Sequence, residues 1–187
     1  LDDKFIFYSK LDEHHRPRKI FRHKLGTSVQ DDQLIFEEKS EAFTCGIGLS
    51  SDEKYYFIST SDHNTSEQYY FSVNEENPKP KLIKERKRGT IYSVNSWDEK
   101  FYLHTNEEAE DFKIDYCENL NNQNWKSFIS AKEEVLIGGL VFLKNWIIRS
   151  ETSNALGKLI IRNPKTGEEN DLNFVDEKVI VPSISLK

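Results

Sequence analysis

The densest group of potential metal ligands in the sequence is the run Asp12, Glu13, His14 and His15. Imidazole and carboxylate groups are common ligands of Zn²⁺ and related ions. Adjacent residues in one tight turn, however, cannot normally close on a single ion, and the spacing fixes no further ligand. We therefore interpret this run as a solvated turn, and we predict no metal site and no bound cofactor in the chain.

A serine nucleophile is not predicted either. In α/β-hydrolases the reactive serine lies in the pattern Gly-x-Ser-x-Gly, where a sharp turn exposes its hydroxyl. That pattern is absent from the 187 residues. The nearest approach, residues 46–50 (GIGLS), has the wrong spacing, and Ser50 and Ser51 fall in a predicted hairpin turn before Asp52. We therefore assign no catalytic residue to this chain.

Two basic runs, residues 16–19 (RPRK) and residues 84–88 (KERKR), could suggest contact with nucleic acid. Such binding needs a wide basic face or aromatic side chains on which bases stack. The chain instead has 26 Lys and Arg residues against 32 Asp and Glu residues, which gives a net charge of −6. We interpret both runs as solvated loops and predict neither nucleic acid nor an anionic membrane as a partner.

Three acidic groups occupy predicted turns, at residues 31–32, residues 75–76 and residues 107–111. Their combined field could attract a basic peptide. They could equally serve only to keep polar turns soluble, and this simpler interpretation is the one we favour.

The two cysteines, Cys45 and Cys117, lie in different segments and form no CxxC pair. Two free thiols are therefore expected, as in a reducing cytoplasm, although the sequence alone leaves a disulfide open. No apolar run has the length of a membrane span, and no signal peptide is visible. We predict a cytoplasmic protein. Because methionine is absent, even at position 1, we also expect the chain to be part of a longer protein.

The strands that must position these residues are short. Aromatic residues make up 12% of the chain and hydrophobic residues in total only 36%, which is typical of many strands joined by polar turns. A triplet of two acids and a lysine precedes apolar runs at residues 2–4, 52–54 and 98–100, and a degraded version (LKN) occupies residues 143–145. The four runs begin at about 45-residue intervals, which indicates a repeat.

A repeat of this length with four short strands per unit predicts an all-β fold, a β-propeller whose blades are the repeats. A two-sheet sandwich is the alternative, but it would not keep the same phase over four units. The predicted units are residues 39–87, 88–131 and 132–178, with an incomplete unit at 1–38 and the start of another at 179–187. The chain would be one partial propeller of about three and a half antiparallel four-stranded blades.

The same pattern predicts how the blades are covered. Continuous apolar runs such as residues 55–58 suggest that both faces of a blade are buried against neighbours. Trp97, Trp125 and Trp146 fall within predicted strands at residues 91–97, 125–129 and 146–150, so we expect them in the blade core and not on a ligand platform.

Several short matches carry a family resemblance. They lie at residues 12–13 and 16–17 (DE, RP), 22–23 (RH), 25–26 (LG), 31–32 (DD), 37–38 (EE), 65–67 (TSE), 101–102 and 105–106 (FY, TN) and 111–112 (DF). On these residues the chain resembles the N-terminal propeller of the prolyl oligopeptidase family of serine peptidases, and within it the oligopeptidase B (protease II) branch. Residues 138–142 and 158–162 match as a pattern only.

The resemblance implies a two-domain enzyme. In that family an α/β-hydrolase domain carries a Ser-Asp-His triad, and a seven-bladed propeller restricts entry to short peptides, which the oligopeptidase B branch cleaves after Arg and Lys. The present chain departs from this plan because it contains no hydrolase domain, so no catalytic residue of the family is carried onto it. The implied partners are the parent's own hydrolase domain and short basic peptides. Open blade faces could also support self-association.

Three functional hypotheses follow. The first is the non-catalytic propeller fragment of an oligopeptidase B-like peptidase, which gates basic peptides in the parent and is inactive alone. The second is a stand-alone scaffold for other proteins, which the single Trp-Asp pair at Trp97 and Asp98 does not favour, since WD-type propellers repeat it. The third is a propeller acting on carbohydrate. It would need paired carboxylates on inner strands, and the predicted inner strands at residues 43–49 and 91–97 contain none.

Overall fold

The computed structural model describes residues 4–172. The single helix in that range, η1 (Val29–Asp31), is a 3-10 turn, and no described helix could cross a membrane. The rest of the regular structure is β. The strands are β1 (Phe5–Leu11), β2 (Pro17–Lys24), β3 (Gln33–Glu37), β4 (Thr44–Leu49), β5 (Tyr55–Ser61), β6 (Ser66–Ser72), β7 (Lys81–Lys84), β8 (Tyr92–Trp97), β9 (Lys100–Thr105), β10 (Lys113–Cys117), β11 (Lys126–Ile129), β12 (Leu136–Leu143), β13 (Trp146–Ser153), β14 (Leu156–Arg162) and β15 (Glu169–Asp171).

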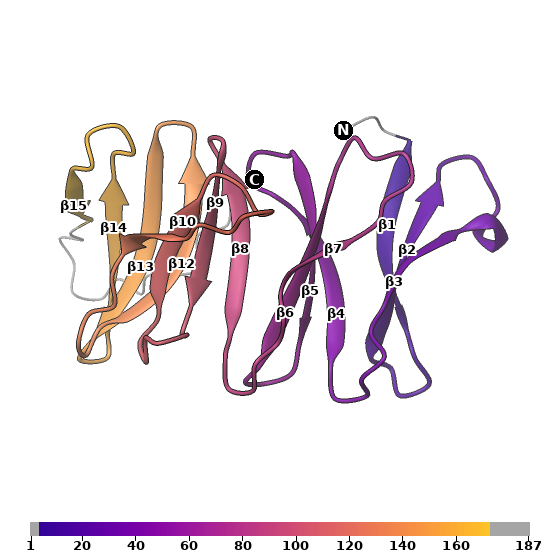
Figure 1. The fold of residues 1–187 in the computed structure, drawn as a ribbon, viewed down its shortest axis with the longest axis horizontal. Coiled ribbons are helices and arrows are strands. Elements are labelled where there is room, and N and C mark those ends of the chain that lie inside the picture. The colour runs from indigo at the N-terminus through magenta and orange to yellow at the C-terminus, as the bar shows by residue number, and fades with distance from the viewer. Residues whose placement is uncertain (1–3, 173–187) are drawn as a thin grey trace.

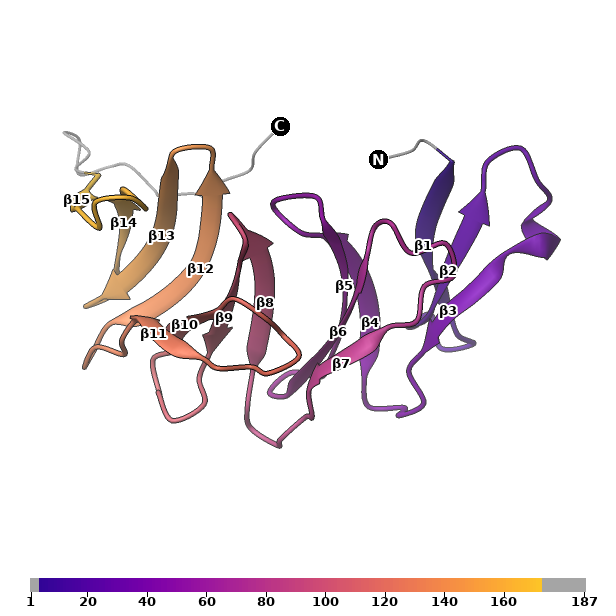
Figure 2. The same cartoon turned by 45° about the horizontal axis from the view of Figure 1, so that its top comes forward.

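These strands form four separate antiparallel sheets. The first has three strands, β1 to β3, and the others have four each, β4 to β7, β8 to β11 and β12 to β15, always in chain order. Figure 1 shows the sheets standing in a row from indigo to yellow, and Figure 2 shows that the row bends into an open arc. The prediction of an all-β partial propeller is confirmed. The predicted further unit at residues 179–187 lies outside the described residues.

Tight hairpins join the strands because their turn residues adopt left-handed backbone angles. Trp97 pairs with Lys100, which leaves a two-residue turn at Asp98 and Glu99 with φ values of 49° and 60°. A second such turn at residues 154–155 joins β13 to β14. Two consecutive positive φ values define the turn whose twist matches that of a β-hairpin. The acidic pair that marks the repeat in the sequence is therefore, in this unit, the turn itself.

The hydrophobic core is divided among three interfaces, which we call the first, second and third seams, each between neighbouring sheets. The first seam contains Ile20, Cys45, Ile58 and Phe71. The second contains Phe57, Ile83, Tyr92, Val94, Phe101, Leu103, Cys117 and Leu120. The third contains Tyr102, Ile114, Ile129, Ile137, Phe142 and Ile147.

Strand β9 shows why the inner strands read as continuous apolar runs. Its residues Phe101, Tyr102 and Leu103 are all buried, but Phe101 and Leu103 face the second seam and Tyr102 faces the third. Successive side chains in a strand point to opposite faces. Since both faces of this sheet are covered by neighbouring sheets, alternation between apolar and polar residues is not required.

The tryptophans divide between core and surface. Trp97 stacks on Phe142 in the third seam, with ring centroids 5.4 Å apart, and Trp125 packs against the second seam from the loop before β11. Trp146 is 42% exposed, so its predicted place in the core is wrong. The reason is strand alternation, because Ile147 fills the third seam and its neighbour Trp146 must point to the opposite face.

Both cysteines are free and buried, as expected from the sequence. Cys45 belongs to the first seam and Cys117 to the second. Burial, together with the nearby Glu38 carboxylate, raises the pKa of the Cys45 thiol to about 11. Burial also raises the pKa of Cys117. Neither thiol is therefore an activated nucleophile, since reactivity requires the thiolate.

Candidate functional site

The turn with two histidines is organised by one carboxylate. Asp12 Oδ1 accepts hydrogen bonds from the backbone nitrogens of His14 at 2.8 Å and Arg16 at 3.0 Å. These bonds, that from Arg16 first, lower the pKa of Asp12. The carboxylate thus closes the turn between β1 and β2. Over residues 4–172, no three His, Cys, Asp or Glu side chains are grouped closely enough to hold a metal ion.

Ser50, at the nearest approach to a nucleophile pattern, is also a turn residue. Its buried hydroxyl donates to Asp52 Oδ1 at 2.7 Å and accepts from the backbone nitrogens of Lys54 and Tyr55 at 3.1 and 3.0 Å. All its contacts belong to the β4–β5 hairpin. The hydroxyl therefore locks this turn, and its one carboxylate partner, Asp52, belongs to the same turn.

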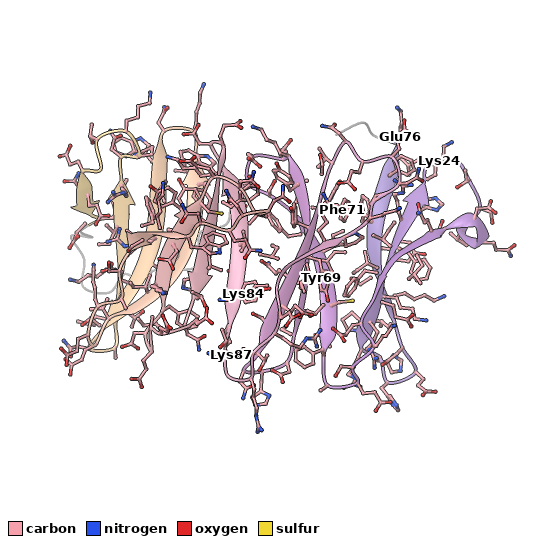
Figure 3. All side chains as sticks on the ribbon, in the orientation of Figure 1. Lys24, Tyr69, Phe71, Glu76, Lys84 and Lys87 are labelled. Carbon is pink, nitrogen blue, oxygen red and sulfur yellow. The ribbon has the colours of Figure 1, made fainter. Side chains whose placement is uncertain are left out.

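The three acidic groups do not converge on one surface. Figure 3 shows Glu76 at one end of the sheets and Lys87 toward the other, with Lys84 between them. Glu107 pairs with both of these lysines, so it lies at the end opposite Glu76. A single acidic funnel built from all three groups is therefore not formed.

Asp32, in the first acidic group, instead holds the β2–β3 loop against its sheet. Its carboxylate accepts a hydrogen bond from the Tyr8 hydroxyl at 2.7 Å and lies 2.6 Å from His23 Nδ1. The hydrogen bond to Asp32 raises the pKa of Tyr8. Burial alone would raise the pKa of Asp32, but the bonds from His23 and Tyr8 outweigh it and lower that pKa.

The interpretation of the basic runs as solvated loops is wrong for two arginines. Arg18 lies in β2, and its Nε and Nη2 donate to the backbone oxygen of Glu38 at 3.1 and 2.8 Å. Arg86 lies after β7 and is turned toward the first seam. Both side chains find buried acceptors on another element, which is the usual condition for burying a guanidinium.

Arg86 joins two buried carboxylates from two different sheets. Its Nη2 lies 2.7 Å from Glu38 Oε2 and 2.6 Å from Glu67 Oε2, and its Nε donates to the same Glu67 oxygen at 3.1 Å. The guanidinium carbon also lies 4.0 Å from the centre of the Phe43 ring. Glu38 and Glu67 are only 4% and 5% exposed. We call Glu38, Glu67 and Arg86 the Arg86 cluster.

The contacts within this cluster favour the charged forms of Glu67 and Arg86. Burial disfavours the Glu67 carboxylate, yet hydrogen bonds from Arg86 outweigh burial and lower the pKa of Glu67. Burial likewise works against the Arg86 cation, and the two carboxylates reverse this and raise its pKa. Tyr69 donates its hydroxyl to Glu67 at 2.9 Å, and burial with that carboxylate raises the Tyr69 pKa to about 12.

Residues next to Glu67 tie the second sheet to the third in the same way. Thr65 Oγ1 accepts from Gly89 N at 3.2 Å, and Ser66 Oγ accepts from Tyr92 N at 2.6 Å while donating to Tyr92 O at 2.8 Å. Gln68 Oε1 accepts from Val94 N at 2.6 Å. Each side chain thus satisfies backbone of the β7–β8 connection or of β8. The TSE match in the sequence has a clear structural role, since it anchors one blade to the next.

Sequence reasoning missed the Arg86 cluster, although its parts were visible. Glu38 and Glu67 belong to the matched segments at residues 37–38 and 65–67, while Arg86 is hidden within a run of exposed charges. Arg86 and Glu38 are 48 residues apart. The cluster can position and rigidify two sheets, and both of its carboxylates are engaged by the one cation.

Comparisons with known proteins agree with this architecture. A family model described as the prolyl oligopeptidase N-terminal β-propeller domain matches residues 1–186. Protease 2 from Moraxella lacunata is 38% identical over 113 residues, covering 60% of this chain and 16% of that protein. Dipeptidyl aminopeptidase BI from Pseudoxanthomonas mexicana is 26% identical over 188 aligned residues, covering 98% of this chain and 26% of its own length.

Solved structures show the same fold. Oligopeptidase B from Trypanosoma brucei, with covalently bound antipain, superposes with a TM-score of 0.86 at 18% identity, over 93% of this chain and 26% of that chain. Oligopeptidase B from Leishmania major superposes with a TM-score of 0.85 at 17% identity, over 94% of this chain and 26% of that chain. The chain therefore spans about a quarter or less of the length of these relatives. It belongs to the prolyl oligopeptidase family, as an N-terminal β-propeller domain.

Proposed function

We propose that this chain is the non-catalytic propeller part of an oligopeptidase B-like serine peptidase, in which it limits access to short basic peptides cleaved after Arg or Lys. The observation that carries the proposal is the 38% identity to Protease 2 within a match to the family's propeller domain over residues 1–186. The chain itself contains no Gly-x-Ser-x-Gly pattern. Its proposed role is therefore to admit short peptides and to exclude large substrates, while another domain cleaves the peptide bond.

The construction of the seams suits this role. A cover that excludes large substrates must keep neighbouring blades together, and the Arg86 cluster joins the first two sheets through hydrogen bonds from a guanidinium. The net charge of −6 also favours cationic peptides over anionic ones by long-range attraction. Exposed carboxylates such as Glu108 and Glu110 contribute to that field.

The proposed partner is the hydrolase domain of the same protein. Oligopeptidase B structures are covered only to 26% by this chain, which leaves room for a separate catalytic domain in those proteins. We also propose a cytoplasmic location, which the two unpaired thiols favour, because secreted proteins usually oxidise their cysteines.

The first test is activity of the isolated 187-residue chain. We expect no hydrolysis of chromogenic peptides that end in Arg or Lys, even at high protein concentration. Contaminating peptidases are excluded by repeating the assay with a Ser50→Ala variant, which removes the nearest serine to a nucleophile pattern. Turnover by the pure chain that is abolished in a Ser50→Ala variant with an unchanged circular dichroism spectrum would overturn the proposal.

The second test asks whether the chain can limit the access of large substrates to an active site. The matching propeller segment of Moraxella Protease 2 is replaced by this chain, and unmodified Protease 2 serves as the control. We expect the chimera to cleave short substrates after Arg and Lys and to leave a folded protein with exposed lysines intact. A chimera that is folded but digests the folded protein would contradict the gating role. That result would favour the alternative function, a scaffold that binds other proteins.

A further inference from the structure

The first seam is hollow at one end. A cavity of about 790 Å³ lies there between strands β1 and β2 of the first sheet and strands β5 and β6 of the second, bordered by the β6–β7 loop. Its volume is in the range of pockets that hold small ligands. Neither the Arg86 cluster nor the turn residues described above line it, so it is a separate feature of the molecule.

The floor of the cavity is aromatic. Phe7 lies 4.5 Å from Tyr56 and 5.7 Å from Phe71 between ring centroids, and Tyr56 and Phe71 stack at 5.3 Å. All three rings line the cavity. Such a floor gains free energy when it covers an apolar or aromatic side chain, through buried area and through ring contacts.

Arg22 joins the two sheets at the border of the cavity. Its Nη1 donates to the backbone oxygen of Glu76 at 2.8 Å, and its Nη2 donates to Gln33 Oε1 at 2.7 Å. Its guanidinium also lies 4.3 Å from the centre of the Phe5 ring. The β6–β7 loop of one blade is thereby fixed to β2 of the other. A ligand would enter an ordered site and would not need to order it.

Charges of both signs stand on the rim. Lys24 and Glu76 line the cavity, and Figure 3 shows both at the same end of the sheets. In the part of the chain that the structure describes, no ion pair or side-chain hydrogen bond involves the Lys24 ammonium or the Glu76 carboxylate. Both are exposed and available to a ligand. An aromatic floor beside a cation and an anion complements a ligand that carries an apolar ring together with charges of both signs.

We propose that this cavity binds a short zwitterionic peptide that ends in an aromatic residue. The aromatic side chain lies on Phe7 and Tyr56, the terminal carboxylate pairs with Lys24, and the ammonium end faces Glu76. This binding is non-catalytic and independent of the gating role. It can therefore be tested on a chain without the hydrolase domain, and its failure would not affect the proposed function. Because the charges are exposed, we expect weak binding, with a Kd on the order of 1 mM.

The experiment is a titration of the 187-residue chain followed by ¹H–¹⁵N NMR. The ligand is the tripeptide Lys-Ala-Phe with a free carboxylate, compared with the same peptide amidated at its end. We expect saturable shifts at the amides of residues 73–77, and a Kd about 2–5 times higher for the amide. Lys24→Gln should raise the Kd for the free-acid peptide by the same factor and leave the Kd for the amidated peptide unchanged. This coupling identifies the carboxylate–Lys24 contact.

The matched control is Lys126→Gln, an exposed lysine at the smaller cavity of about 360 Å³ beside the β10–β11 loop. It should leave both affinities unchanged. Both substitutions are on the surface, and unchanged spectra of the free proteins will show that they fold. Absence of saturation up to about 10 mM, equal affinity for acid and amide, or an equal effect of Lys126→Gln would overturn the proposal.

Discussion

Arg86 is the only cation in contact with both Glu38 and Glu67 among the ion pairs of residues 4–172, so both buried carboxylates depend on it. Removing one partner of a buried pair leaves an uncompensated charge, whereas an isolated surface pair contributes little. The cluster also shows why charge in the sequence is hard to interpret. Lys84, Arg86 and Lys87 are neighbours in one run, yet only Arg86 turns into the seam.

Replacement of Arg86 by Met should lower the free energy of unfolding by about 2–4 kcal/mol, because two buried carboxylates lose their cation. The side chain is 28% exposed, so we expect a value at the lower end of the range for buried pairs. Urea unfolding followed by circular dichroism measures the change. Lys54→Met, which breaks the exposed pair with Glu99, is the control and should lower the free energy of unfolding much less, because exposed ion pairs contribute little. Equal losses in both variants would contradict the role assigned to Arg86.

A pH dependence is expected from Glu169. Hydrogen bonds from Arg149 and Arg162 lower its pKa from 4.5 to about 2 in the folded chain. A carboxylate with a lowered folded pKa stabilises the fold above its unfolded pKa, and this stabilisation is lost as pH falls toward the folded value. The contribution is therefore complete above about pH 5 and lost by about pH 2.

Glu169→Gln should remove this part of the acid sensitivity. We expect the variant to be about 1–2 kcal/mol less stable at pH 7, after allowance for solvent screening, and to equal the parent near pH 2. Urea unfolding at pH values between these limits checks the slope. Glu168→Gln, at the exposed neighbouring position, should leave the pH profile unchanged. A profile that is identical in Glu169→Gln and the parent would refute the assignment.

At the scale of elements, strands were predicted well and their ends less well. Strand β13 begins at Trp146 as predicted, whereas β8 begins at Tyr92 and not at residue 91. Strand existence follows from runs of aromatic and branched residues, which are local. Strand ends depend on pairing with a neighbour. Strand β13, for example, extends to Ser153 because β14 continues the ladder as far as Leu156.

The β13–β14 hairpin offers a test of turn chemistry. Ala155 has a φ of 60°, a region that costs an alanine roughly 1 kcal/mol and a glycine almost nothing. Ala155→Gly should therefore stabilise the chain by about 0.5–1 kcal/mol. The measurement is the urea midpoint. The control is Ala42→Gly, in an exposed turn without positive φ, which should be neutral or destabilising. A loss of stability in Ala155→Gly would show that this turn adopts another conformation.

For the whole molecule, the repeat phase and the family resemblance were sufficient to predict an open row of blades. The chemistry between blades was not predictable in the same way. Each seam depends on side chains far apart in sequence, such as Ser66 and Tyr92, whose contact follows from sheet packing and not from any local pattern. The alternative interpretation of the acidic groups, a single surface that attracts basic peptides, likewise required a geometry that the opposite ends of the sheets do not provide.

The outer face of the first sheet should make the isolated chain self-associate. Phe7 faces the first seam, so alternation turns Ile6 and Tyr8 to the opposite face, together with Leu34. Ile6 and Leu34 are 51% and 45% exposed there. Contiguous apolar surface of this kind favours association. Light scattering should therefore show a mass that rises with concentration.

The double variant Ile6→Lys and Leu34→Lys should shift this equilibrium toward monomer, because two charges would have to be buried in the contact. Leu156→Lys is the matched control, since Leu156 is 70% exposed at a hairpin turn away from that face. It should leave the mass unchanged. A parent chain that stays monomeric at every concentration, or an equal effect of Leu156→Lys, would exclude this face as the contact.

The placement of the two thiols gives each of two seams its own natural reporter. Cys45 is enclosed in the first seam and Cys117 in the second, and both are unpaired. A reagent that modifies thiols can reach either sulfur only when its own seam opens, through local or global unfolding. Labelling rates at the two positions therefore time the separation of neighbouring blades independently. They would reveal whether the arc comes apart as a whole or one blade at a time.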